Sequence, residues 1–152
     1  FIQLTSPDAI IATPSFGEYL IEKTPEITGR DAKSLGLRWF FCAGEPGGGN
    51  PEIRKRLSEG FGAKVFDHTG GGHAFHGIEC EEPPSQYSGM HFVSEDYCLL
   101  ELVDPASKSP IPLAEGAVGE MVFTFLDWEG TPLMRYALGD MLEVHTDPCA
   151  CG

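Results

Sequence analysis

The chain has 152 residues, of which 41% are hydrophobic and 22% charged, and these are ordinary proportions for a globular protein. Its formal net charge of −13 argues against a nucleic-acid partner, because phosphate contacts require clustered Lys and Arg. The one locally basic segment, EIRKRL at 52–57, is predicted to be a solvated helix face. No apolar run reaches the length of a bilayer span, so no membrane association is expected.

Strand and helix signals alternate over the first half of the sequence. Short runs rich in β-branched or aromatic residues are typical of buried strands, and two amphipathic segments lie between them. A strand–helix–strand–helix–strand order predicts right-handed crossovers and a parallel sheet, which is an α/β fold. The predicted strands are DAIIAT at 8–13, LRWFFCAGEP at 37–46 and AKVFDHT at 63–69.

The two predicted helices carry recognisable end signals. In the first, Ser15 and Glu18 have the spacing of a capping box. In the second, Asn50 is a good N-cap, Pro51 suits the first helical position, and Gly62 can close the helix. We therefore expect one helix within PSFGEYLIEK at 14–23 and the other over 51–61.

After residue 80 the helical pattern disappears. Strand-length segments alternate with Gly- and Pro-rich connections, which predicts an antiparallel sheet or a small barrel. A hairpin turn is expected at Asp127–Gly130. The boundary falls in the Pro- and Ser-rich stretch at 79–89. The sequence thus predicts an α/β part over 1–79 and a β-barrel-like subdomain over 80–152.

Ligands of open parallel sheets bind at the carboxyl ends of the strands. The segments Gly44–Pro46 and Asp67–Gly72 follow two predicted neighbouring strands, so we expect them side by side at one rim. A glycine-rich loop after a strand can present backbone N–H groups to phosphate. However, HTGGGHAF matches neither the Walker loop nor the dinucleotide fingerprint, so the loop by itself does not identify a ligand.

Five cysteines are an odd number and do not suit a closed disulfide set. Without a secretory signal, a reducing cytoplasm is the expected location. The chain also lacks an initiator Met and stops at DPCACG, so we expect a segment of a longer protein. Cys42 and Cys98 lie in apolar runs and are predicted to be core residues.

The other cysteines allow a metal site. Cys80, His91, Cys149 and Cys151 supply the Cys₃His set of a closed structural zinc, which would join the start of the second part to its end. An equally supported alternative is that these are unrelated surface cysteines and a histidine that bind no metal. His73 and His76 are alternative fourth ligands. A catalytic metal site made of His68, His73 and His76 is a third interpretation.

No nucleophile–base arrangement can be built from the serines and histidines. The segment RYALGD, Arg135–Asp140, offers a cation and a carboxylate around a turn. By default we interpret these two side chains as ordinary exposed charges without a ligand.

Taken in order, several segments resemble an adenylate-forming acyl-CoA ligase of the phenylacetate–CoA ligase group. The resemblance covers essentially the whole chain. It implies the parallel β-α-β unit of the ligase N-terminal domain followed by the antiparallel subdomain. The segments are PDAIIATPSFGEYL, LRWFFCAGEP, NPEIRKRLSEGFGAKVFD, EC…GMHF and ELVDP…PLAEGAVGEMVFTFLDWEGTPLMRYALGD…PCACG.

The resemblance implies a reaction and roles for single residues. Such ligases use ATP to convert a carboxylic acid into an acyl-adenylate, and then transfer the acyl group to coenzyme A. Gly44, Glu45 and Pro46 match the segment that lines the adenine and acyl pocket. Asp67 matches the residue near the adenine amino group. Asp140 matches the carboxylate that holds the ribose hydroxyls, and its two oxygens suit a diol.

The nucleotide loop departs from the family pattern of aromatic-Gly-Leu-Ser/Thr-Glu. Gly70 is kept, whereas Thr69 stands in place of the stacking aromatic. Gly72 replaces the hydroxyl that meets the α-phosphate, and His73 replaces the Glu that binds magnesium. Because magnesium prefers oxygen ligands, we expect weaker charge neutralisation on the triphosphate.

The resemblance also bears on the metal and on activity. Cys80, His91, Cys149 and Cys151 match recurrent Cys/His positions of the group, which favours the structural zinc. The upstream phosphate loop and the C-terminal small domain with its lysine have no counterpart in these 152 residues. The piece alone is therefore expected to be inactive, with no catalytic residue of its own.

The prediction is the central part of an ATP-dependent aryl- or acyl-CoA ligase. ATP with magnesium, coenzyme A and a carboxylic acid would be the ligands of the parent enzyme. The alternative is a non-catalytic zinc-containing ligand-binding or scaffold module with an eroded active site. The acyl substrate and the oligomeric state, including a homodimer, are left open.

Overall fold

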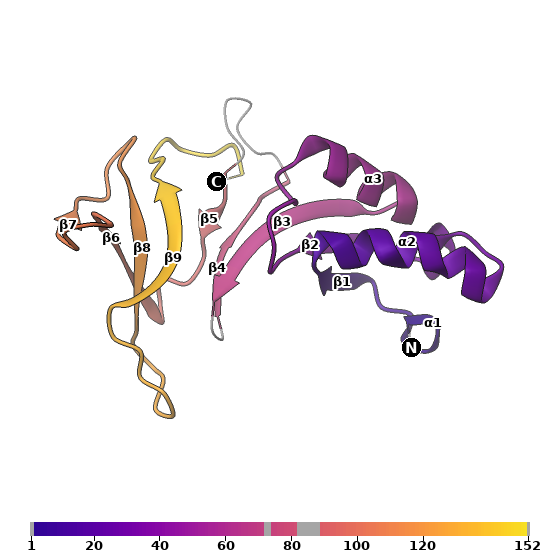
Figure 1. The fold of residues 1–152 in the computed structure, drawn as a ribbon, viewed down its shortest axis with the longest axis horizontal. Helices are drawn as coiled ribbons and strands as arrows, with labels where there is room; N and C mark the ends of the chain where they lie inside the picture. Colours follow the sequence, from indigo (N-terminus) through magenta and orange to yellow (C-terminus); the bar gives the residue numbers. More distant parts are fainter. Residues whose placement is uncertain (1, 72–73, 82–88, 152) are drawn as a thin grey trace. The chain divides into compact units, whose positions relative to one another are not determined.

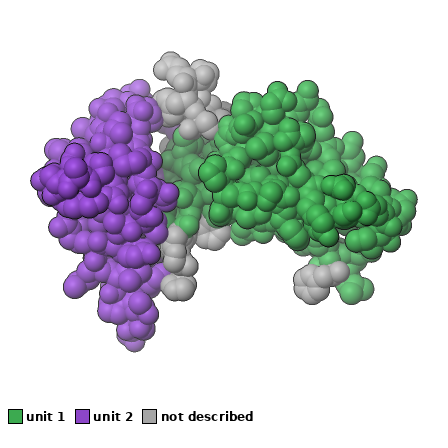
Figure 2. Space-filling view, in the orientation of Figure 1, with its two compact units in different colours: residues 1–91 green, residues 92–152 purple. Residues whose placement is uncertain are grey.

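The computed structural model describes residues 2–71, 74–81 and 89–151. The chain divides into two compact units, 1–91 and 92–152 (Figure 2). Among the described residues, no helix combines the length and the hydropathy needed to cross a membrane.

The described part of unit 1 is built on a five-stranded sheet in the order β1-β2-β3-β4-β5 (Figure 1). The three strands predicted from the sequence are parallel neighbours, which confirms the α/β prediction. The last two strands extend the sheet beyond that prediction. The strands are β1 (Ala9–Ala12), β2 (Trp39–Cys42), β3 (Lys64–Gly71), β4 (Ala74–Ile78) and β5 (His91–Phe92).

Two long helices connect the parallel strands: α2 (Pro14–Thr28) and α3 (Pro51–Phe61). Asn50 caps α3 as predicted, because its Oδ1 accepts the N–H of Glu52 at 2.9 Å. Gly62 ends α3 in the left-handed conformation at φ 67°. Two short helical turns complete the unit: α1 (Ile2–Thr5) and η1 (Ala32–Leu35).

The predicted capping box of α2 is wrong. Thr13 is the N-cap, and its Oγ1 accepts the N–H of Phe16 at 3.2 Å. Pro14 occupies the first helical position, where its fixed φ and missing N–H suit a helix start. Ser15 therefore lies inside the helix, and its N–H is left available to a partner outside α2.

The core of unit 1 lies between α2, α3 and one face of the sheet. Phe40 and Phe61 are buried and stack at 5.3 Å between ring centroids. Gly17 brings α2 against this face, because a Cβ there would lie 2.6 Å from Phe40 and 2.7 Å from Leu57. The predicted core position of Cys42 is confirmed, since it is fully buried.

The glycine-rich segment that follows the predicted strand 63–69 is partly a strand itself, which corrects the expectation of a loop. β3 continues through Gly71 and pairs antiparallel with β4, with Thr69 opposite Gly77. The register shifts between Thr69 and Gly70, which marks a bulge or irregularity. Gly72 and His73, which carry two of the predicted departures from the ligase pattern, lie outside the described residues.

In the described residues, unit 2 has a four-stranded antiparallel sheet in the order β7-β6-β8-β9 (Figure 1). The sequence predicts the antiparallel arrangement, whereas it does not predict the strand order. Its core holds Cys98, Phe123 and Phe125, and Trp128 stacks on Phe125 at 4.0 Å between ring centroids. The strands are β6 (Cys98–Val103), β7 (Pro110–Ile111), β8 (Val118–Phe125) and β9 (Tyr136–Glu143).

The predicted turn at Asp127–Gly130 belongs to a longer connection, residues 126–135. The N–H of Phe125 bonds the carbonyl of Leu133 at 3.0 Å, so the chain returns toward β8 after the predicted turn. The hairpin between β8 and β9 is thus present, but its connection is not a tight turn.

Candidate functional site

The rim of the parallel sheet brings Asp67 against the loop that follows β2. Cys42, the last residue of β2, pairs with Asp67 on β3, so both strands reach the same edge. A Cβ on Gly48 would lie 2.5 Å from the Asp67 Cγ and 2.7 Å from the Cys42 Cβ. The loop backbone therefore lies directly on the carboxylate, and only glycine fits at residue 48.

The predicted pocket segment Gly44–Pro46 lies in the same loop. Gly44 has φ +80°, which favours glycine. The Glu45 Oε1 accepts the N–H of Ser15 at 2.6 Å, at the N-terminus of α2. The pKa of Glu45 is lowered because the backbone N–H and then the hydroxyl of Ser15 donate to its carboxylate. Glu45 thus joins the loop after β2 to the helix after β1.

Asp67 is a partly buried carboxylate with competing neighbours. Burial raises its pKa, and the nearby Glu79 raises it further. Arg54 and the backbone N–H groups of His68 and Gly49 act in the opposite direction. The carboxylate therefore lies at the rim with a net penalty on its charged form, which a donor from a ligand would relieve.

Thr69 and Gly70, assigned to the nucleotide loop by resemblance, extend β3 past the end of β2. Thr69 is half-buried and Gly70 is exposed. Both follow Asp67 on the same strand, at the carboxyl side of the sheet.

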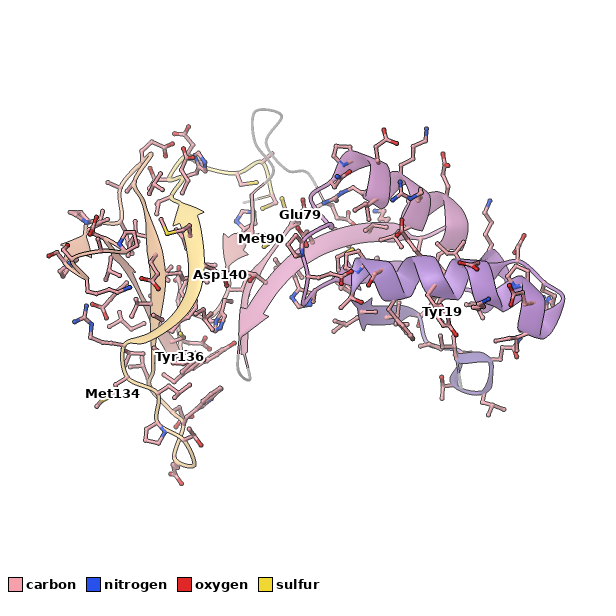
Figure 3. All side chains as sticks on the ribbon, viewed as in Figure 1. Tyr19, Glu79, Met90, Met134, Tyr136 and Asp140 are labelled. Carbon is pink, nitrogen blue, oxygen red and sulfur yellow. The ribbon has the colours of Figure 1, made fainter. Side chains whose placement is uncertain are left out.

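Asp140, the predicted ribose ligand, is an exposed residue of β9 in unit 2 (Figure 3). It lies at an irregularity in the pairing with β8, where Val122 faces Ala137 and Glu120 faces Met141. Three residues of β9, 138–140, therefore oppose the single Met121. Such bulges redirect side chains and are common beside functional sites.

Arg135, the cation of the same segment, has a partner inside unit 2. Its Nε donates to the Glu101 Oε2 at 3.2 Å. Its backbone has φ +49° and its N–H bonds the Thr124 hydroxyl at 3.0 Å. Arg135 thus has a structural role at the start of β9, whereas Asp140 faces solvent.

Four side chains could hold a metal ion: those of Cys80, His91, Cys149 and Cys151. Their ligand atoms all lie within 4.8 Å of one another. Donors bound tetrahedrally to zinc at roughly 2.0–2.3 Å are separated by less than this limit. A Cys₃His donor set with this spacing fits a structural zinc.

The alternative histidines do not join this group. Among the residues that the structure describes, the metal-competent group excludes His68 and His76, and both are buried. His73 lies outside the described residues. The described residues therefore give no support to a metal centre built on these histidines.

Glu115 anchors the segment that leads to Cys149 and Cys151. Its Oε2 accepts the N–H of Thr146 at 2.6 Å, and its Oε1 lies 3.1 Å from the His145 Nδ1. The Thr146 N–H and the His145 ring lower the pKa of Glu115. The chain just before the two thiols is thereby fixed to the rest of unit 2.

No protein-family model matches the chain. Phenylacetate-coenzyme A ligase from Thermus thermophilus is 34% identical over 99% of this chain and 33% of its own length. The enzyme of the same name from Escherichia coli is 31% identical over 89% of this chain and 30% of its own length.

A solved structure agrees with these sequence relatives. It is an open conformation of 2-hydroxyisobutyryl-CoA ligase in complex with 2-HIB-AMP and CoA. It matches 92% of this chain and 30% of that chain, with 29% identity and a TM-score of 0.75. This chain is a homologue of phenylacetate-CoA ligases. It spans about a third of the length of the curated relatives.

In this ligase homologue, the sequence prediction missed Arg54 and Glu79. Arg54 was expected on a solvated helix face, yet its guanidinium points inward and makes three hydrogen bonds. A signal was present, because Arg54 shares a helical stripe with Leu57 and Phe61 at spacings of three and seven. Glu79, just before Cys80, carried no such signal and is buried.

Proposed function

We propose that this chain supplies the adenylate-binding part of an AMP-forming acyl-CoA ligase. One observation carries the proposal. The homology to phenylacetate-CoA ligases covers the segment in which a glycine-rich loop packs on Asp67 at the carboxyl ends of the parallel strands. The related 2-hydroxyisobutyryl-CoA ligase was crystallised with an acyl-adenylate and CoA, which supports the same ligand class. The acid would be an aryl or other small carboxylic acid.

The proposed reaction has two steps. The carboxylate attacks the α-phosphorus of ATP, and pyrophosphate leaves. The thiol of coenzyme A then attacks the acyl carbon, and AMP leaves. In this scheme Asp67 accepts from the adenine amino group, the Gly44–Pro46 segment lines the pocket, and Asp140 accepts from the ribose hydroxyls.

Magnesium does not fit the residue that this chain offers. The family position for its carboxylate ligand is His73, and magnesium requires hard oxygen donors. We therefore propose no magnesium ligand in this chain. The part described is proposed to bind and orient the adenylate, while the groups that drive adenylation belong to other parts of a complete ligase.

Calorimetry with a stable acyl-adenylate mimic, phenylacetyl-sulfamoyl adenosine, tests the proposal. We expect binding by the 152-residue chain and a loss of about tenfold or more in affinity for Asp140→Ala, because a charged acceptor is removed. Asp127→Ala, which removes another exposed carboxylate of unit 2, is the matched control and should bind as the parent does. No binding by the parent chain would refute the proposal.

The Cys/His group supports a second role, as a structural zinc site. Cys80, His91, Cys149 and Cys151 would hold the ion, and four protein donors would leave no open position for catalysis. Bound zinc would supply cross-linking of these chain segments. Metal analysis should find one zinc per chain in the parent and in Cys98→Ala, and none in Cys149→Ser/Cys151→Ser.

The calorimetry and the zinc analysis together also distinguish the proposed function from the alternative of a non-catalytic module. Zinc retained without both C-terminal thiols would contradict the assigned ligands. Zinc binding without any affinity for the adenylate mimic would favour a non-catalytic scaffold or ligand-binding module.

A further inference from the structure

One arginine of α3 connects three segments of the rim. The Arg54 Nε donates to the Gly48 carbonyl at 3.0 Å, and Nη1 donates to the Val65 carbonyl at 3.0 Å. Nη2 donates to the Glu79 Oε2 at 2.6 Å. The acceptors belong to the loop after β2, to β3 and to the segment after β4, so a single guanidinium ties all three together.

Glu79 links Arg54 to Asp67 through hydrogen bonds. Its Oε2 also accepts the Asp67 N–H at 2.8 Å, and its own N–H donates to the Asp67 carbonyl at 3.1 Å. The Glu79 side chain is only 3% exposed, so its charge depends on a nearby cation. Arg54 supplies that cation, and Figure 3 shows Glu79 beside β3.

Arg54 also restrains the Asp67 carboxylate through the loop after β2. Gly49 donates its N–H to the Asp67 carboxylate, and Gly48 packs on it without room for a Cβ. Arg54 holds this same loop at the Gly48 carbonyl. Both the backbone of Asp67 and the loop that covers its side chain are therefore set by one side chain.

We infer that Arg54, acting through Glu79, is a positioning residue that sets the Asp67 carboxylate for recognition of the adenine amino group. The inference rests on the proposed adenylate-binding function. Arg54 itself bonds protein acceptors with Nε, Nη1 and Nη2, so it acts through Asp67 and the loop. Lysine cannot replace it, because one ammonium cannot reach three acceptors that the planar fork reaches in different directions.

Base selectivity tests the inference more sharply than affinity alone. The adenine amino group donates to a carboxylate, whereas inosine presents a carbonyl oxygen at that position. The parent chain should therefore bind phenylacetyl-sulfamoyl adenosine more tightly than the inosine analogue. Arg54→Lys should reduce this preference by about tenfold, the scale of one charged hydrogen bond.

A matched control and a neutral pair separate positioning from stability. Arg56→Lys changes the same residue type in the same helix, at an exposed pair with Glu18, and should leave the preference unchanged. Arg54→Leu/Glu79→Gln removes the buried charge but keeps an oxygen for the Asp67 N–H. It should be more stable than Arg54→Leu alone, yet should not regain the adenosine preference.

Hydrogen exchange gives a readout that needs no ligand. In Arg54→Lys the Asp67 and Gly49 amides should exchange faster, while the Leu57 amide inside α3 stays protected. Adenosine preference kept in a folded Arg54→Lys chain would overturn the inference and leave the proposed function standing. Absence of binding to either analogue by the parent chain would overturn both.

Discussion

The two carboxylates proposed to face the nucleotide lie in opposite environments. Asp67 is partly buried, carries backbone hydrogen bonds and depends on the ion pair that the buried Glu79 forms with Arg54. Asp140 is exposed on a bulged stretch of β9 beside Gly139, which has φ +86°. Changes at or around a carboxylate held by its fold should alter stability, whereas an exposed carboxylate can be removed at the cost of binding alone. The comparison therefore predicts which variants lose stability.

Loss of Arg54 should have the largest effect on stability. Arg54→Ala leaves the buried Glu79 carboxylate without its cation, and such changes destabilise by about 3–5 kcal/mol. Arg54 is 30% exposed, so we expect the lower end, about 3 kcal/mol. Urea unfolding would measure it. Arg56→Ala, which breaks the exposed pair with Glu18, should cost at most about 1 kcal/mol, and equal costs would contradict the buried-pair interpretation.

Crowding of the Asp67 side chain should have the next largest effect. Gly48→Ala places a methyl group within 2.5 Å of the Asp67 Cγ, and overpacking of this kind costs about 2 kcal/mol. Gly130→Ala is the control in unit 2, because no atom lies within 4 Å of its added Cβ. Thermal unfolding should lower Tm only for the first variant. A normal Tm for Gly48→Ala would show that the loop can move off the carboxylate.

Neutralisation of Asp67 should change the pH dependence of stability. Because the folded-state pKa of Asp67 is raised, its charged form is disfavoured, and the penalty grows as pH rises above the unfolded value of about 4. Asp67→Asn should therefore be more stable than the parent at pH 7, and the difference should vanish near pH 3. Denaturant curves across this range measure it. Equal stability of Asp67→Asn and the parent at pH 7 would contradict a penalty on the charged form of Asp67.

The smallest expected effect concerns Glu115 in unit 2. Its lowered pKa means that its stabilisation is present above the unfolded value of about 4.3 and is lost as pH falls through the folded value. Glu115→Ala should accelerate hydrogen exchange at the Thr146 amide, which loses its acceptor. Glu129→Ala, an exposed acid elsewhere in the unit, should leave that amide unchanged. An unchanged Thr146 amide in Glu115→Ala would show that the ladder bond between Val144 and Ala117 suffices.

Local signals in the sequence predicted much of the architecture. The parallel strands, the caps of α3 and the burial of Cys42 and Cys98 follow from short-range patterns: apolar runs, an Asn-Pro helix start and a closing glycine. The ligase resemblance also needed only ordered segments, and the homologues agree with it. The patterns that predict these features each lie within a short stretch of the chain. A single sequence is therefore enough to recognise them.

The tertiary structure decided the features that join distant segments. Ser15 lies inside α2 because Pro14 begins the helix, and Glu45 from another loop then accepts its N–H. Arg54 turns inward because acceptors on three segments meet there.

The glycine-rich segment after Asp67 also combines one feature predicted from the sequence with one decided by the tertiary structure. The sequence by itself predicted that Thr69 stands in place of the stacking aromatic of the family's nucleotide loop, because that prediction needs only the order of residues. Only the tertiary structure decided that β3 runs on to Gly71, because a strand needs a partner and β4 supplies its hydrogen bonds. Periodicity in the sequence can place a polar side chain on a buried face, but it does not identify a partner many residues away, so such partners had to come from the fold.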